Sequence, residues 1–103
     1  MIYHILYTKT AKQDIDNIYN YISNKLFNPM AASTLIRKII KTIDILETMP
    51  FKFCLYKFKS KENNMIRYIP INNYLIFYTV EKFSVYILRI LYKRQNIDYK
   101  KFE

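Results

Sequence analysis

The sequence predicts an α+β fold in which an antiparallel helical hairpin packs on a mostly antiparallel sheet of four to five strands. Two features of the first half indicate the hairpin. Apolar residues recur at three- and four-residue steps in two stretches, and an Asn-Pro pair at positions 28–29 separates them. A third feature indicates the sheet, because residues 74–80 and 85–92 are rich in alternating β-forming side chains.

A strand and a first helix are expected at the beginning of the chain. Residues 2–7 alternate in a strand-like way. Thr10 is the predicted N-cap of the helix, and Gln13 completes a capping box three residues later. Asp14 and Asp16 fall in the first turns, where the helix dipole favours acidic side chains. The apolar stripe of this helix comprises Ala11, Ile15, Ile18, Ile22 and Leu26.

The second helix follows after a tight turn. Asn28 is a favourable N-cap and Pro29 suits the first helical position. Pro50 ends the helix, so the hairpin is expected to run from about residue 10 to 48. Its apolar stripe comprises Ala32, Leu35, Ile36, Ile39, Ile43 and Leu46. Because each stripe is one-sided, the hairpin must bury both stripes against the rest of the chain.

Four strands are predicted after the hairpin, at residues 53–58, 65–69, 74–80 and 85–92. Residues 59–64 are expected to form an exposed turn, and Asn72-Asn73 another. The chain has no glycine, so its turns must use Asn, Asp, Ser and Lys, of which Asn best tolerates positive φ. We expect the first strand to insert into this sheet, with the helices on one face and basic groups on the other.

Length and composition predict a single domain spanning residues 1–103. Cys54 is the only cysteine, which excludes an internal disulfide and a cysteine-rich zinc site and fits a reducing compartment. The first residues lack the pattern of a signal peptide, and no apolar run approaches the roughly 20 residues of a membrane span. The sequence therefore predicts a soluble cytoplasmic protein without contact to a membrane.

The charge is strongly basic and unevenly distributed. With 17 Lys+Arg and 8 Asp+Glu, the net charge is +9. Residues 1–50 carry 6 basic and 4 acidic side chains, whereas residues 51–103 carry 11 and 4. A basic half rich in aromatic residues is typical of a polyanion-binding surface. A solubilising surface without a specific ligand explains the charge equally well.

Several short motifs follow one another along the chain: Ala11-Lys-Gln-Asp14-Ile15, Asn28-Pro-Met-Ala-Ala32, Pro50, Arg67, Asn73-Tyr-Leu-Ile-Phe-Tyr78 and Ile87-Leu-Arg-Ile-Leu-Tyr-Lys-Arg94. In their order and spacing these motifs resemble the RelE/ParE family of toxins from type II toxin–antitoxin systems, which includes plasmid stabilisation proteins. The resemblance covers nearly the whole chain.

If the chain is a RelE-like nuclease, the resemblance implies a set of catalytic residues. Arg67 would hold the scissile phosphate, Arg94 would stabilise the charge of the transition state, and Tyr99 would position or activate the attacking 2′-OH. Lys57 and Lys59 would bind RNA and lower the pKa of that tyrosine, with Lys52 and Lys61 as the alternative positions. Such cleavage is independent of metal ions, and neither a metal site nor another cofactor is expected.

Other residues complete the predicted RNA-binding surface or offer alternatives to it. Arg89, Tyr92 and Lys93 are assigned to RNA binding, although Arg89 could instead pair with an acidic residue on the helices. His4 is interpreted as a core or edge residue, since it has no partner for acid–base catalysis. Tyr74 shares a strand face with Tyr78, which suits core packing or base stacking.

For each of these basic residues, the alternative interpretation is a solvated surface charge without a role in catalysis or binding. Arg67 has a further alternative, a strand-edge ion pair with Glu62 or Glu81.

Three functions remain open at this point. The first, which the set of Arg67, Arg94 and Tyr99 favours over the others, is a ribosome-dependent mRNA endonuclease that inhibits translation. The second is a non-enzymatic, ParE-like inhibitor of DNA gyrase, and the third is a plain nucleic-acid-binding domain. For a toxin we expect a cognate antitoxin, whose acidic and largely disordered segment would fold over the basic face of the sheet.

Overall fold

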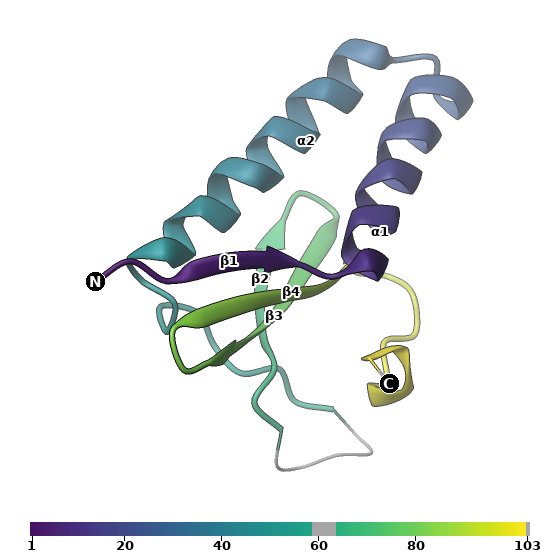
Figure 1. Cartoon of the computed structure of the whole chain (residues 1–103). Coiled ribbons are helices and arrows are strands. Elements are labelled where there is room, and N and C mark those ends of the chain that lie inside the picture. Colours follow the sequence, from purple (N-terminus) through teal and green to yellow (C-terminus); the bar gives the residue numbers. More distant parts are fainter. Residues whose placement is uncertain (59–63, 103) are drawn as a thin grey trace.

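The computed structural model describes residues 1–58 and 64–102, and it has the predicted α+β architecture (Figure 1). A helical hairpin covers one face of a four-stranded sheet. In chain order the elements are β1 (His4–Tyr7), α1 (Lys9–Asn20), the π-helical turn η1 (Tyr21–Lys25), α2 (Pro29–Asp44), the 3₁₀ turn η2 (Ile45–Glu47), β2 (Arg67–Ile71), β3 (Tyr74–Glu81), β4 (Ser84–Tyr92) and the 3₁₀ turn η3 (Tyr99–Phe102). None of the helices in the described part of the chain is long and apolar enough to cross a membrane.

The strands are ordered β1-β4-β3-β2. Strands β2, β3 and β4 form an antiparallel meander, and β1 pairs with β4 in parallel, with His4 opposite Ser84 and Tyr7 opposite Ile87. The prediction that the first strand inserts into the sheet is therefore wrong in one respect, because β1 joins at an edge. Short turns join β2 to β3 and β3 to β4, so these strands pair as antiparallel neighbours, and the outer side of β4 is left for β1.

The N-cap of α1 is Thr8, and the predicted capping box of Thr10 and Gln13 does not form. The Thr8 hydroxyl oxygen accepts a hydrogen bond from the backbone N–H of Ala11, at 3.1 Å. The same hydroxyl donates to the backbone carbonyl oxygens of Ile87 and Leu88, at 2.9 and 3.1 Å. A contact with β4, remote in sequence, therefore decides where the helix begins. In α2, Asn28 and Pro29 occupy the predicted positions, and the Asn28 side chain accepts from the Ala31 N–H.

The helical stripes and the sheet enclose the main core. Its fully buried members include Ile39 and Ile43 of α2, Ile76 and Tyr78 of β3, and Ile87 of β4. Most of the second predicted stripe is buried, as is the beginning of the first. Leu26, the last residue of the first stripe, is 55% exposed, because the tip of the hairpin extends beyond the sheet (Figure 1).

The first predicted strand after the hairpin, residues 53–58, does not form. The segment has isolated bridges at Leu55, which pairs with Arg67, and at Phe58. The backbone N–H of Tyr56 donates to the Ile66 carbonyl at 2.8 Å, and that of Tyr68 donates to the Cys54 carbonyl at 3.1 Å. The next predicted strand, at 65–69, is displaced to Arg67–Ile71 as β2. Of the turn predicted at 59–64, residues 59–63 lie outside the described part of the chain. The aromatic side chains of this segment are nevertheless partly or fully buried, Phe53 against the main core and Tyr56 and Phe58 on the opposite face of the sheet.

A second apolar cluster lies on the face of the sheet opposite the helices. Phe77, Leu75 and Leu91 from the sheet are buried there together with Phe58 and Ile66. The partly buried residues that cover them are Tyr56, Tyr68, Leu88, Ile97, Tyr99 and Phe102. The prediction of a basic outer face is therefore wrong over this area, because aromatic side chains from outside the sheet cover it and leave the cations at its rim.

Two strand turns bear out the expectation for a chain without glycine. Asn72, between β2 and β3, has φ 51°, and Lys82, between β3 and β4, has φ 55°. A third residue with positive φ, Phe27 at 52°, lies in the loop between η1 and α2. A β-carbon makes this left-handed conformation costly, so all three positions store local strain.

Candidate functional site

Arg89 lies at a bulge in β4, which changes its surroundings from those expected of a regular strand. Phe77 stands opposite Arg89 while the next residue, Tyr78, stands opposite Ile87, so Leu88 is the extra residue. The guanidinium of Arg89 donates to both carboxylate oxygens of Asp14, at 2.8 and 2.9 Å. The alternative prediction, an ion pair with an acidic residue of the helices, thus describes the position of Arg89.

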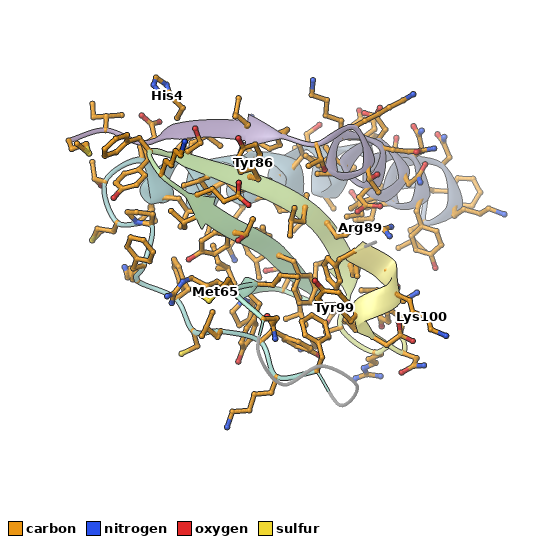
Figure 2. The ribbon with its side chains drawn as sticks, turned by 60° about the horizontal axis from the view of Figure 1, so that its bottom comes forward. His4, Met65, Tyr86, Arg89, Tyr99 and Lys100 are labelled. Carbon is orange, nitrogen blue, oxygen red and sulfur yellow. The ribbon has the colours of Figure 1, made fainter. Side chains whose placement is uncertain are left out.

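The Asp14 carboxylate connects α1 to β4. It does not lie in the first turn of the helix, where it was expected to interact with the helix dipole. It is almost completely buried, and it also accepts a hydrogen bond from the backbone N–H of Ile90 at 3.0 Å. Its hydrogen bond raises the pKa of Arg89 above the ordinary value, against the opposing effect of burial. Arg89 also donates to the Lys101 carbonyl at 3.3 Å, near the C-terminal turn that carries Tyr99 and Lys100 (Figure 2).

Arg67, at the beginning of β2, lies on the helix side of the sheet. It is on the same face of β2 as Ile69 and Ile71, which are both part of the main core. Its guanidinium donates to the carbonyl oxygen of Phe53 at 2.6 Å and lies 5.2 Å from the centre of the Phe51 ring. Arg67 is therefore bound by the segment that follows the hairpin.

Tyr99 lies on the opposite side of the sheet. Its ring packs edge-on against Phe58, with the ring centres 5.6 Å apart, and belongs to the second cluster. Lys57 lines a cleft of about 490 Å³ together with Asp98 and Lys100, the two neighbours of Tyr99. Lys59 lies outside the described residues.

The predicted catalytic residues are separated by the sheet. Arg67 and Tyr99 lie on opposite faces, as their neighbours show. Arg67 stands opposite Tyr78, and Tyr78 stands opposite Ile87, so Arg67 is level with Ile87 in the sheet. Ile87 lies five positions before Tyr92, the end of β4, which corresponds to roughly 15 Å along the strand. Arg94 is exposed in the turn beyond that end. The structure thus brings Lys57 close to the segment of Tyr99 and keeps Arg67 away from both.

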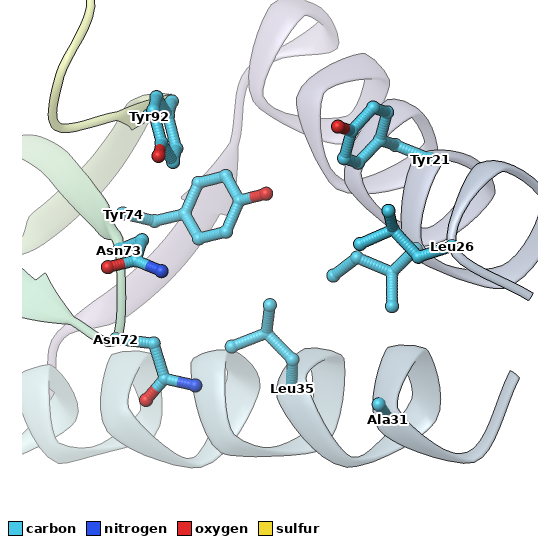
Figure 3. Close-up of a pocket in the computed structure, with 9 residues that line it drawn as sticks. Tyr21, Leu26, Ala31, Leu35, Asn72, Asn73, Tyr74 and Tyr92 are labelled. Carbon is cyan, nitrogen blue, oxygen red and sulfur yellow. The ribbon is translucent and has the colours of Figure 1, made fainter. Parts of the chain in front are cut away.

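A groove that the sequence analysis did not predict opens between the hairpin tip and the end of the sheet (Figure 3). It has a volume of about 630 Å³. Tyr74 extends from β3 towards the helices, and Leu26 and Leu35 approach from the other side. Tyr92, predicted to bind RNA, packs edge-on against Tyr74 with the ring centres 5.7 Å apart. The lining residues are Tyr21, Ile22, Leu26, Ala31, Leu35, Asn72, Asn73, Tyr74 and Tyr92.

The polar groups of this groove are three tyrosines and the turn between β2 and β3. Burial raises the pKa of Tyr74, and the nearby Tyr21 and Tyr92 raise it further, so its hydroxyl remains a neutral hydrogen-bond donor. Lys38 donates to the Asn72 side chain at 3.0 Å, and the backbone N–H of Lys93 donates to the Asn73 carbonyl at 2.9 Å. The ammonium of Lys38 therefore lies beside the groove.

The length of the two stripes is the sequence signal that could have identified this groove. The first stripe continues to Leu26 and the second begins at Ala32, so apolar residues extend to the turn of the hairpin, where another segment is needed to cover them. For metal binding, the described residues contain no group of three or more His, Cys, Asp or Glu that could hold an ion.

A family model and a solved structure match this chain. Residues 5–97 match the family model described as "ParE toxin of type II toxin-antitoxin system, parDE". Among solved structures, a chain described as "Chromosomal ParDE TA system from P. aeruginosa" superposes with a TM-score of 0.71 at 19% identity, covering 88% of this chain and 96% of that chain. At this identity the likeness establishes the fold. A search of curated proteins finds no significant match.

Proposed function

This chain belongs to the ParE toxin family of type II toxin–antitoxin systems, and from that premise we propose that it inhibits DNA gyrase by binding it and does not cut RNA. Membership of the family implies a cognate antitoxin as partner.

The observation that carries the proposal is the separation of Arg67 from Tyr99 by the sheet. Cleavage by an attacking 2′-OH needs the phosphate-binding group and the base within contact distance of one reacting centre. Arg67 instead binds the Phe53 carbonyl, and Arg89 binds Asp14. A toxin that acts by binding needs no such constellation, and this arrangement supports that mode of action.

Exposed cations near the end of β4 are the proposed contacts with the target. Lys93 and Arg94 are both exposed and follow directly after Tyr92. Gyrase acts on DNA, so a chain with a net charge of +9 is attracted to the enzyme–DNA complex by long-range electrostatics. In this proposal the two residues contribute to affinity and association rate, and they have no chemical role.

The RelE-like nuclease is the second candidate, and one observation favours it. Lys57 lies beside the segment that carries Tyr99, in a cleft that also contains Asp98 and Lys100. In this alternative Arg94 and not Arg67 would supply the positive charge at the phosphate.

Two assays with the purified full chain separate the candidates. The first follows supercoiling of relaxed plasmid by purified gyrase, and the second follows cleavage of mRNA on purified ribosomes with EDTA present. We expect inhibition in the first and intact mRNA in the second. Cleavage that is lost in Tyr99→Phe, with supercoiling unaffected, would overturn the proposal in favour of the nuclease.

A further inference from the structure

The side of α2 that faces away from the sheet carries a dense group of cations. Residues 1–50 contain 6 basic side chains, and three of them, Arg37, Lys38 and Lys41, lie within five consecutive positions of this helix. All three are exposed. Ile39 lies between them in sequence but on the opposite side of the helix, where it is fully buried in the main core. The backbone that carries the cations is therefore held in place by the fold.

Two shallow hollows adjoin along this side of the helix. Their volumes are about 440 and 230 Å³, and Thr34 and Arg37 line both of them. Together they extend from Pro29 to Ile45, which corresponds to roughly 24 Å of helix. No carboxylate is among the described residues that line them. The lining of the two hollows, the basic surface of α2, comprises Pro29, Met30, Ser33, Thr34, Arg37, Lys38, Lys41, Thr42 and Ile45.

We propose that the basic surface of α2 binds the phosphate backbone of duplex DNA without reading its base sequence. Arg37 and Lys41 would make the direct contacts with phosphates. In the cell the duplex would be the DNA held by gyrase, and this part of the inference rests on the proposed function. The toxin would then contact both the enzyme and the DNA on which it acts.

The side-chain chemistry of this surface matches phosphate groups. Half or more of the hydrogen bonds between proteins and DNA go to phosphates and sugars, and Arg, Lys, Ser and Thr are among their donors. Arg37 and Lys41 are four positions apart, about 6 Å along the helix, and Thr34 precedes Arg37 by nearly one turn. Duplex DNA rises about 3.4 Å per base pair, so a surface of roughly 24 Å corresponds to about seven base pairs.

Lys38 connects this surface to the turn between β2 and β3. Its ammonium donates to the Asn72 side chain at 3.0 Å, and the carbonyl of the next residue, Asn73, accepts from the backbone N–H of Lys93 at 2.9 Å. The basic surface of α2 therefore adjoins the turn that carries Lys93 and Arg94, the proposed contacts with the target. DNA bound along α2 would lie beside the enzyme that the toxin binds.

The composition of this surface favours a duplex over a single strand. Proteins that bind single strands without sequence preference stack the bases on aromatic side chains in a positively charged groove. None of the described residues that line the two hollows is aromatic. A duplex keeps its bases stacked inside and presents only its sugar–phosphate backbone, for which cations and hydroxyls are sufficient.

An acidic protein segment or an anionic membrane fits this surface less well. Met30 and Ile45 line its two end regions, and the lining residues between them are all polar, so a peptide finds no apolar pocket for an anchoring side chain. A helix that binds a membrane inserts its apolar face. In α2 that face is occupied, because Leu35 and Ile39 are buried in the main core.

Two charge-matched double variants provide a direct test. Arg37→Gln/Lys41→Gln removes two cations from the basic surface of α2, and Lys9→Gln/Lys12→Gln removes two exposed cations from α1. Both lower the net charge by two, from +9 to +7, so long-range attraction falls similarly and only the direct contacts differ. Fluorescence anisotropy would measure binding of the full chain to a labelled duplex of about 20 base pairs at ~50 mM salt. Circular dichroism would verify that both variants fold.

We expect the wild type to bind duplexes of different sequence with similar affinity. Arg37→Gln/Lys41→Gln should weaken binding by roughly tenfold or more, and Lys9→Gln/Lys12→Gln by less than about twofold. The slope of log affinity against log salt concentration should become shallower by about 2 in the first variant, because each lost phosphate contact removes about 0.9. Arg37→Lys, which keeps the charge, should bind within about twofold of the wild type.

Equal losses in the two double variants, no binding of the duplex by the wild type, or tighter binding of a single strand of the same length would overturn the proposal. Equal affinity for polyglutamate, with the same loss in Arg37→Gln/Lys41→Gln, would also overturn it and would identify an acidic protein segment as the ligand. The binding assay contains no gyrase. Inhibition of supercoiling without duplex binding would therefore refute this inference alone, and duplex binding without inhibition of supercoiling would refute the proposed function alone.

Discussion

Asp14 and Arg89 connect the helical hairpin to the last strand across 75 positions of sequence. Two parallel hydrogen bonds join the guanidinium to the carboxylate, with Nε–Oδ2 2.8 Å and Nη2–Oδ1 2.9 Å. Because the same carboxylate binds the backbone N–H of Ile90, it holds α1 against the bulged part of β4. The exposed fractions of the side chains are 9% for Asp14 and 24% for Arg89, so solvent screens the pair only weakly.

Asp14→Asn should destabilise the fold strongly. The amide has nearly the shape of the carboxylate and can still accept from Ile90, but it leaves the guanidinium of Arg89 without its counter-charge. We expect a loss of about 3 kcal/mol in the free energy of unfolding, measured by urea denaturation. The control is Asp16→Asn, an exposed position in the same helix, which should change it by less than ~0.5 kcal/mol. Similar values for both variants would show that the ion pair contributes little.

Lys82→Gly should stabilise the protein, although it removes a side chain. Lys82 has φ 55° in the exposed turn between β3 and β4, where a β-carbon costs about 1–2 kcal/mol. Glycine removes this strain but adds flexibility to the unfolded chain, which offsets about 0.4–1 kcal/mol. The expected net gain is roughly 0.5–1 kcal/mol in denaturant unfolding. Glu81→Gly, in the adjacent residue at the end of β3, should be destabilising and is the control for a general effect of glycine.

The free energy of unfolding should fall at alkaline pH because Tyr78 is buried. Its side chain is fully buried and donates to the Pro50 carbonyl at 2.8 Å, and burial raises its pKa from 10.0 to about 12. Below pH 10 the hydroxyl is protonated in both states, so it causes no pH dependence. Between pH 10 and 12 only the unfolded chain ionises, and the free energy of unfolding falls by about 2–3 kcal/mol in total.

Denaturation curves at pH 9 to 12 would measure this decrease. Tyr78→Phe removes the titrating group and should flatten the curve, at the cost of a lower stability at neutral pH because the hydrogen bond is lost. Burial also raises the pKa values of Tyr7 and Tyr74, so part of the decrease should persist in the variant. If the free energy of unfolding of Tyr78→Phe fell with pH as steeply as that of the wild type, Tyr78 would not be the group that causes the decrease.

Arg67→Ala should lower the stability of the protein, whereas Arg94→Ala should weaken its inhibition of gyrase. Arg67 binds the Phe53 carbonyl and the ring of Phe51, so its loss should lower stability by about 1.5–3 kcal/mol. Arg94 is exposed, and its loss should change stability by less than ~0.5 kcal/mol while weakening the inhibition of gyrase. Thermal unfolding and the supercoiling assay measure the two effects. Reduced stability of Arg94→Ala, or full inhibition by it, would contradict its proposed role.

The local signals of the sequence were sufficient for most of the secondary structure. The spacing of apolar residues located both helices, Asn28 and Pro29 marked the beginning of α2, and Asn72 marked a turn with positive φ. The strands that alternate most clearly became β3 and β4. These features depend on neighbouring residues only, since capping, turn formation and amphipathic periodicity act over a few positions.

Long-range contacts decided the features that were predicted wrongly. Thr8 replaced Thr10 as the cap of α1 because its hydroxyl binds the carbonyls of Ile87 and Leu88. Residues 53–58 pack by their aromatic side chains and form isolated bridges in place of a continuous strand. A strand-like alternation records which side chains point the same way, and it contains no information on whether a hydrogen-bonding partner is present.

By itself, the sequence determined the fold class, the family and the excess of positive charge. Only the tertiary structure decided the role of each cation: Arg89 is held by Asp14, Arg67 lies on the helix side of the sheet, and Arg94 remains exposed. It also decided that the hairpin tip extends past the sheet and forms a groove with Tyr74 and Tyr92. The reason is physical, because the charge and polarity of a residue belong to its own atoms, whereas its partner and its access to solvent depend on which distant segments the fold brings beside it.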